Sequence, residues 1–227
     1  MKNNKMLKNV IKLCISLFLF FYRSILITPI VYIFNINTKK MSTLTEIILS
    51  LTANIILCIV IILMYRKELI KEWKKFKENL FNNIDTSIKY WLIGLIIMVM
   101  SNFIIAFILG GGQATNEQGV QKMIDVAPII MLITAGIIGP INEELIFRKC
   151  FKNILKNKWF FILISGIVFG YLHVSGANSL NQFLYIIPYS SLGIAFATTY
   201  YKTNTVFSSI FVHMLHNTIL TLISISI

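Results

Sequence analysis

Apolar runs close to the length of a membrane span recur from one end of this 227-residue chain to the other. Hydrophobic residues make up 56% of the sequence and charged residues only 13%, a balance that excludes an ordinary soluble domain. A segment inside a bilayer has no water to satisfy its backbone, so each run is expected to be a helix. The sequence therefore predicts an all-α fold, a polytopic bundle of transmembrane helices.

We expect an N-terminal group of helices, residues 1–126, and a C-terminal helical core, residues 127–227, that carries the chemistry. About seven spans are predicted, at residues 11–34, 45–65, 91–109, from about 127 onward, 159–174, 180–200 and 206–225. Between the second and third spans, residues 66–89 combine basic and apolar side chains at helical spacing. This pattern predicts a basic amphipathic helix on an anionic membrane surface, so membrane lipid is an expected partner.

The net charge of +12 is concentrated in the connections between the apolar runs. This distribution follows membrane topology, and with no nucleic-acid-binding motif present we expect no nucleic acid as a partner. Basic connections alternate with connections that have few or no basic residues. The alternation predicts a multi-pass protein of the cell membrane with a cytoplasmic N-terminus and an external C-terminus. Arg23 lies inside the first span, where an ion pair within the bundle and an interfacial position are both open.

Two adjacent carboxylates, Glu143 and Glu144, interrupt the fourth apolar run. An ionisable group at membrane depth costs at least about 2.5–3.5 kcal/mol, so the pair requires an explanation. Arg148 follows Glu144 by four residues and shares its helix face, whereas Glu143 points about 100° away. One carboxylate is thus expected to be anchored and the other to be available for chemistry. The alternative is a helix that simply ends in water at this point.

All three histidines, His173, His213 and His216, fall in apolar segments. Imidazoles and carboxylates inside a membrane bundle are expected to face one another or a wet cavity, because lipid offers them no partner. Phe169 and His173 are four residues apart and share a helix face, and the same holds for His213 and Asn217. We therefore expect the glutamates and histidines to form one polar site with Asn217. Spacing alone leaves His216 open as a member.

A carboxylate, two imidazoles and an amide suffice for peptide hydrolysis without a covalent intermediate or a cofactor. A carboxylate in a partly dry pocket can act as a base toward water, and an imidazole can help to hold that water. A second imidazole and an amide can donate hydrogen bonds to a developing oxyanion. A zinc site of two histidines and one glutamate is the rival. We predict no metal, because no His-Glu-x-x-His spacing exists and the three cysteines are scattered.

Three short motifs occur in order on successive apolar segments; they are Glu143-Glu144-x-x-x-Arg148, Phe169-x-x-x-His173 and His213-x-x-x-Asn217. Together they resemble the CPBP family, which comprises the CAAX prenyl endopeptidases of type II and the bacterial Abi-type intramembrane proteases. The resemblance covers residues 127–217, and the earlier helices match only in being apolar. It implies a glutamate-dependent intramembrane peptidase without a cofactor.

Through this resemblance the site residues acquire implied catalytic roles. Glu143 is the implied base that activates water together with His173, while His213 and Asn217 form the implied oxyanion hole. The implied supporting residues are Glu144, Arg148 and Phe169. The family pattern also selects His213 over His216, because only His213 stands four residues before Asn217.

The resemblance implies cleavage of a membrane-associated peptide or protein substrate. Relatives act on prenylated CAAX proteins or are linked to bacteriocin self-immunity and peptide maturation, and the sequence does not choose among these substrates. A non-catalytic immunity or scaffold protein that binds a peptide or partner is the main alternative. A small transporter that uses Glu143 and the histidines as a proton relay is another, which the lack of internal repeats disfavours. The oligomeric state is left open.

Overall fold

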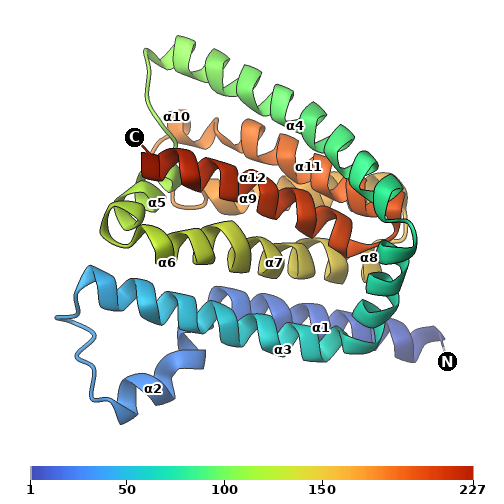
Figure 1. The fold of residues 1–227 in the computed structure, drawn as a ribbon, viewed down its shortest axis with the longest axis horizontal. Coiled ribbons are helices and arrows are strands. Elements are labelled where there is room, and N and C mark those ends of the chain that lie inside the picture. The colour runs from blue at the N-terminus through green and yellow to red at the C-terminus, as the bar shows by residue number, and fades with distance from the viewer. Residues whose placement is uncertain (1, 227) are drawn as a thin grey trace.

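Helices follow one another through residues 2–226, the part of the chain that the computed structural model describes, and no strand occurs there (Figure 1). The predicted all-α helical bundle is confirmed. The elements are α1 (Lys2–Phe21), the 3-10 segment η1 (Arg23–Ile27), α2 (Thr28–Ile33), α3 (Thr43–Glu78), α4 (Leu80–Leu109), α5 (Thr115–Val126), α6 (Pro128–Ile133), η2 (Thr134–Ile138), α7 (Gly139–Glu143), η3 (Glu144–Cys150), α8 (Phe151–Ile154), α9 (Lys158–Val174), α10 (Leu180–Phe183), α11 (Ile186–Thr203) and α12 (Val206–Ser226).

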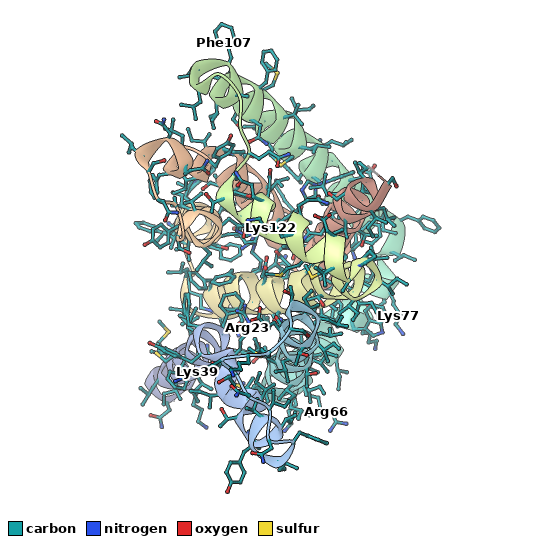
Figure 2. The ribbon with its side chains drawn as sticks, turned by 90° about the vertical axis from the view of Figure 1, so that its left-hand side faces the viewer. Arg23, Lys39, Arg66, Lys77, Phe107 and Lys122 are labelled. Carbon is teal, nitrogen blue, oxygen red and sulfur yellow. The ribbon has the colours of Figure 1, made fainter. Side chains whose placement is uncertain are left out.

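The helices form a stack whose two outer edges can be identified in both figures. α4 lies at one edge of the molecule, and α1, α2 and α3 lie at the opposite edge (Figures 1 and 2). α11 packs against both α4 and α9, and α12 packs against η2. Helices from the C-terminal half of the sequence therefore occupy the middle of the bundle.

The first predicted span, residues 11–34, is not one straight helix. α1 ends at Phe21, and the chain turns through η1 into α2 with a bend of 74°. Arg23 opens the bend and donates from Nη1 to the backbone oxygen of Phe20 at 3.4 Å. Pro29 stands in the first turn of α2, where its missing N–H removes no helical hydrogen bond. An exposed arginine and a proline thus both favour a break within this apolar run.

The prediction of a separate amphipathic helix at residues 66–89 is wrong. The first half of this segment is the end of α3, which runs without interruption to Glu78, and the second half opens α4 at Leu80. At 1.5 Å per residue the 36 residues of α3 extend about 54 Å, well beyond the roughly 30 Å core of a bilayer. Leu69 and Phe76 are buried against the protein, whereas Ile70 and Phe81 are exposed.

Within residues 2–226, four helices are long and apolar enough to cross a membrane: α3, α4, the composite helix Pro128–Ile154 and α12. The bent pair at the N-terminus would be a fifth. The predicted number of about seven spans is not confirmed. α9 has only 17 residues, and the predicted span 180–200 is divided between the short α10 and α11. Serine, threonine and tyrosine side chains lower the hydropathy of α11, which is not among the four candidate spans.

The composite helix Pro128–Ile154 carries both glutamates and departs twice from α-helical geometry. α6 passes into the π-helical segment η2, and α7 passes into the π-helical segment η3. π-helical turns are rare in proteins as a whole, but those that occur are often found at functional sites. Pro140, in α7, has no N–H with which to bond back along the helix. Every residue of η3 is buried, so the second π-helical segment lies wholly in the interior.

α9 and α11 approach each other closely because glycines face their contact. A Cβ atom on Gly166 would lie 2.5 Å from Cγ1 of Ile194 and 2.8 Å from the backbone nitrogen of that residue. A Cβ atom on Gly170 would clash with Ser190. Gly166 and Gly170 therefore allow the two helices to approach closely, as small residues do at helix contacts in membranes. The contact fixes the position of α9, which carries Phe169 and His173.

Candidate functional site

The two adjacent carboxylates have different surroundings at the junction of α7 and η3. The side chain of Glu144 is fully buried, whereas 22% of the Glu143 side chain is exposed. Oε2 of Glu144 lies 3.4 Å from Nε of Arg148, which is also fully buried. The four-residue spacing predicted this ion pair. One carboxylate is therefore held in the interior, and the other remains partly accessible.

Arg148 is positioned by contacts with α9 and α11. Its Nη1 donates to Oγ of Ser165 at 3.3 Å, and Ser165 in turn donates to the backbone oxygen of Phe147 at 2.6 Å. The guanidinium carbon lies 4.8 Å from the centre of the Phe169 ring and 6.0 Å from that of Phe196, within the range of cation–π contacts. A buried ion pair is tolerated only when further contacts compensate for the lost hydration. These neighbours supply part of that compensation.

His213, on α12, faces both carboxylates. Its Nδ1 lies 3.0 Å from Oε1 of Glu144, and its Nε2 lies 3.7 Å from Oε2 of Glu143. The ring is almost fully buried and stacks on Phe196 with the ring centres 4.5 Å apart. Oε2 of Glu143 has no hydrogen-bond partner among residues 2–226. The Glu144 carboxylate thus fixes the imidazole through Nδ1, and Nε2 of the ring points toward the Glu143 carboxylate.

His173 lies beside this cluster and makes no ion pair with either glutamate in the described part of the chain. Its Nδ1 donates to the backbone oxygen of Phe169 at 2.9 Å, and its ring stacks on Tyr189. The Phe169 ring lies between the two histidines, 4.5 Å from His173 and 5.4 Å from His213, measured between ring centres. His173 also borders a cavity of about 150 Å³. At about 30 Å³ for each water molecule, that volume holds about five.

Asn217 lies one turn beyond His213 and contacts the composite helix at its first irregular segment. Its Nδ2 donates to the backbone oxygen of Ala135 at 3.0 Å, and Oγ1 of Thr218 donates to the backbone oxygen of Gly136 at 3.3 Å. Pro140 has no N–H to donate to the preceding turn, so one backbone oxygen there lacks its helical donor. Side chains of α12 thus satisfy backbone groups that the break exposes.

His216, which spacing left open, does not join the cluster. Its Nδ1 accepts a hydrogen bond from Nε1 of Trp91 on α4 at 3.3 Å, and the side chain is buried there. α12 therefore presents His213 to the glutamates and His216 to α4. The choice of His213, which the family pattern made, agrees with this placement.

Sequence reasoning missed a second buried cluster of charges, on α3 and η3. Nζ of Lys149 lies 2.7 Å from Oε2 of Glu68 and 2.6 Å from Oε1 of Glu72. Oε2 of Glu72 also accepts from the backbone N–H of Val206 at 2.7 Å, at the first residue of α12. The four-residue spacing of Glu68 and Glu72 places both acids on one helix face and could have indicated this cluster. The segment that contains them was predicted to be a surface helix instead. The cluster ties the composite helix to the start of the helix that carries His213.

Among residues 2–226, no three His, Cys, Asp or Glu side chains are arranged to hold a metal ion. The glutamates and His213 are spaced for hydrogen bonding and proton transfer. The arrangement offers a partly exposed carboxylate as a base, an oriented imidazole and a buried arginine that balances the second carboxylate. Such a set can activate water and stabilise a developing negative charge.

Comparisons with known proteins point to the same part of the chain. The family described as type II CAAX prenyl endopeptidase Rce1-like matches residues 125–219, a range that contains all seven candidate site residues. YdiL of Bacillus subtilis, described as a candidate membrane peptidase, is 30% identical over 171 residues, which are 72% of this chain and 66% of YdiL. The UPF0177 protein YxdF of Lactococcus lactis is 27% identical over 148 residues, or 62% of this chain and 80% of YxdF.

A third relative is the membrane-embedded CAAX protease MroQ of Staphylococcus aureus, 28% identical over 145 residues, which are 57% of this chain and 55% of MroQ. The chain thus spans between about half and four fifths of the length of these three relatives. No solved structure gives a significant match. The family match, the named relatives and the helical bundle agree, and the chain belongs to the CPBP family of Rce1-like, type II CAAX prenyl endopeptidase proteins.

Proposed function

We propose that this protein is an intramembrane endopeptidase that hydrolyses a membrane-associated peptide or protein with an activated water molecule. Family membership and the peptidase names of two relatives support the reaction class. The observation that carries the proposal is the placement of His213 between an anchored carboxylate, Glu144, and an accessible one, Glu143. That arrangement separates the supporting carboxylate from the one free to react.

Glu143 is the proposed general base. Its Oε2 is buried without a hydrogen-bond partner among residues 2–226, and the side chain as a whole is 22% exposed, so the carboxylate has unused capacity to accept a hydrogen bond from a water molecule. The carboxylate takes a proton from this water as the water oxygen attacks the peptide carbonyl carbon, and the proton then passes to the leaving amine. In its neutral form His173 donates from Nδ1 to Phe169 and keeps Nε2 as an acceptor that can help to hold the water.

His213 and Asn217 are the proposed donors to the oxyanion. A ring that donates to Glu144 from Nδ1 and to the oxyanion from Nε2 carries a proton on each nitrogen. The amide of Asn217 has two N–H bonds, and only one is needed for the backbone oxygen of Ala135. Loss of one oxyanion donor typically lowers kcat about 100- to 1,000-fold.

We propose small membrane-associated peptides as substrates, in bacteriocin self-immunity or peptide maturation.

The test compares peptide termini in membranes of cells that express the wild-type chain or the variant Glu143→Gln. New termini are expected with the wild type and not with the variant at equal protein level. Glu78→Gln is the matched control, because Glu78 is exposed on α3 and makes only a surface ion pair. Termini that persist unchanged in Glu143→Gln would contradict the proposed role of Glu143.

A non-catalytic scaffold or immunity protein is the second candidate. It is favoured by the internal bonds of His213 and Asn217, because each of these side chains also holds two helices together. A scaffold would retain its biological effect in Glu143→Gln, while substitutions that weaken partner binding would abolish it. The same expression experiment, scored for immunity as well as for cleavage, separates the two functions.

A further inference from the structure

A second cavity lies between the bent N-terminal segment and α3. Its volume is about 430 Å³, within the usual range of small-ligand sites. The walls come from η1, α2, the loop that follows α2 and the first turns of α3. The surface exposed inside the cavity is mostly apolar, with side chains of Ile27, Val31, Met41, Leu49 and Ala53 among the lining residues. The cavity is therefore suited to a hydrocarbon chain.

Basic side chains surround this apolar cavity. Arg23 lines it and makes no ion pair within residues 2–226. Lys39 and Lys40 are exposed and lie between two lining residues of the loop, Thr38 and Met41. Figure 2 shows Arg23 and Lys39 on the same side of the molecule. Glu46 is the one carboxylate among the lining residues, so these three cations leave an excess of positive charge at the cavity.

The surroundings indicate that this ligand comes from the membrane. Tyr32 and Ile33 at the end of α2, and Phe34 directly after it, are large, apolar and strongly exposed. Such a surface is stable beside lipid chains, and an arginine next to it can bind a phosphate group through two parallel hydrogen bonds. Positive charges close to a membrane also attract anionic lipids. The apolar lining thus matches the acyl chain of a lipid, and the basic rim matches its phosphate group.

We propose that this cavity is a binding site for an anionic phospholipid. One acyl chain lies against the apolar wall of α2 and α3, and the phosphate contacts Arg23 with Lys39 and Lys40 at the rim. The site does not depend on the proposed peptidase function.

The cavity adjoins the glutamate–histidine site through α3. Ala53 lines the cavity, and the backbone oxygen of the next residue, Asn54, accepts from Nδ2 of Asn142 at 2.9 Å. Asn142 directly precedes Glu143. This hydrogen bond connects the wall of the cavity to the residue beside Glu143.

The first test measures lipid binding to the purified full-length chain in detergent by native mass spectrometry. The probes are phosphatidylglycerol, phosphatidylcholine with the same acyl chains, and glycerol 3-phosphate. We expect phosphatidylglycerol to bind more tightly than phosphatidylcholine, and each cation removed to weaken its binding about fivefold. The variants are Arg23→Gln and the double variant Lys39→Gln/Lys40→Gln, which lies in an exposed loop and leaves the helices unchanged. Lys122→Gln, an exposed lysine on α5, is the matched control.

The second test fills the cavity without changing its charge. Val31→Trp projects into the lined space, whereas Ile33→Trp changes an exposed position on the same helix. Phosphatidylglycerol binding is expected to fall only in Val31→Trp. Equal binding of the two phospholipids, or binding unchanged in both charge variants, would overturn the proposal. Equally tight binding of glycerol 3-phosphate would also overturn it, because the acyl chain would then contribute nothing.

Discussion

Nδ1 of His213 lies 3.0 Å from Oε1 of Glu144, and this contact joins the last helix to a residue 69 positions earlier. Glu144 also pairs with Arg148, so one buried carboxylate connects a cation on its own helix with an imidazole on α12. Oε2 of Glu143 lies farther from the same imidazole, 3.7 Å from Nε2, and its side chain is partly exposed. The two neighbouring glutamates therefore have different surroundings, and their substitution should have different consequences.

Glu144→Gln is expected to destabilise the protein by about 3–5 kcal/mol, because it leaves the Arg148 charge buried without a carboxylate. Glu143→Gln is expected to change stability by less than about 1 kcal/mol and to abolish cleavage. Denaturant unfolding in detergent micelles measures the first effect, and the peptide-terminus experiment measures the second. Equal destabilisation by the two variants would show that the carboxylates are not divided in this way.

Asn217→Ala and Thr218→Val each remove one side-chain hydrogen bond to the broken composite helix. Each loss is expected to cost about 1 kcal/mol of stability. Only Asn217→Ala should lower the rate of cleavage by a further factor of about 100 or more, because only Asn217 is a proposed oxyanion donor. Unfolding free energies and initial rates of both variants provide the comparison. If both variants lose activity equally, Asn217 has a structural role alone.

Gly170→Ala is expected to destabilise the bundle by about 1–3 kcal/mol, since the new methyl group must displace α9 from Ser190 on α11. His173 lies less than one turn further along α9, so cleavage should fall as well. Gly176→Ala makes the same chemical change where nothing lies within 4 Å of the added atom, and it should be nearly neutral. Thermal unfolding of the pair is the measurement. A neutral Gly170→Ala would mean that α9 and α11 are not in tight contact.

The cluster around Lys149 should respond unequally to loss of its two acids. The side chain of Glu68 is 40% exposed, and its loss leaves Glu72 as a partner, so Glu68→Gln should cost at most about 1 kcal/mol. Glu72→Gln removes the charge of the more buried partner, and the single amide oxygen cannot accept from both Lys149 and the Val206 N–H at the start of α12. A loss of about 3 kcal/mol or more is expected in that variant. Chemical unfolding of both variants checks the order.

Chelators distinguish a glutamate mechanism from a zinc mechanism. We expect cleavage by the purified protein to continue unchanged in EDTA and in 1,10-phenanthroline, because the proposed base and oxyanion donors are protein side chains. Initial rates before and after chelation, with a known zinc peptidase treated in parallel, are the measurement. A loss of activity that added zinc restores would favour the rival metal site.

Much of the site could be predicted because it follows from local spacing and from the cost of polar groups in lipid. The pairing of Glu144 with Arg148 depends on a four-residue interval alone. The gathering of the glutamates around His213 follows because an apolar bundle offers them no other partners. The break at Arg23 could not be predicted from the sequence, because an apolar run with one charge is compatible with both a straight and a bent helix.

Other relationships depend on which helices meet, and local spacing contains no such information. The amide of Asn217 reaches the oxygen of Ala135 only because α12 packs against the segment that Pro140 interrupts. Glu68 and Glu72 belong to a basic stretch, and they pair with a buried lysine only because the packing brings Lys149 against them. The pattern of that stretch predicted a surface helix because periodicity identifies an apolar face without identifying what covers it.

By itself the sequence determined that the chain is an all-α membrane bundle and which side chains must avoid lipid, since both depend on composition and helical period. Only the tertiary structure decided that His213 faces both glutamates, and which polar groups Asn217 and Lys149 contact. The reason is physical: the cost of burying a charge is a property of the residue, whereas the partner that offsets it is a property of the packing.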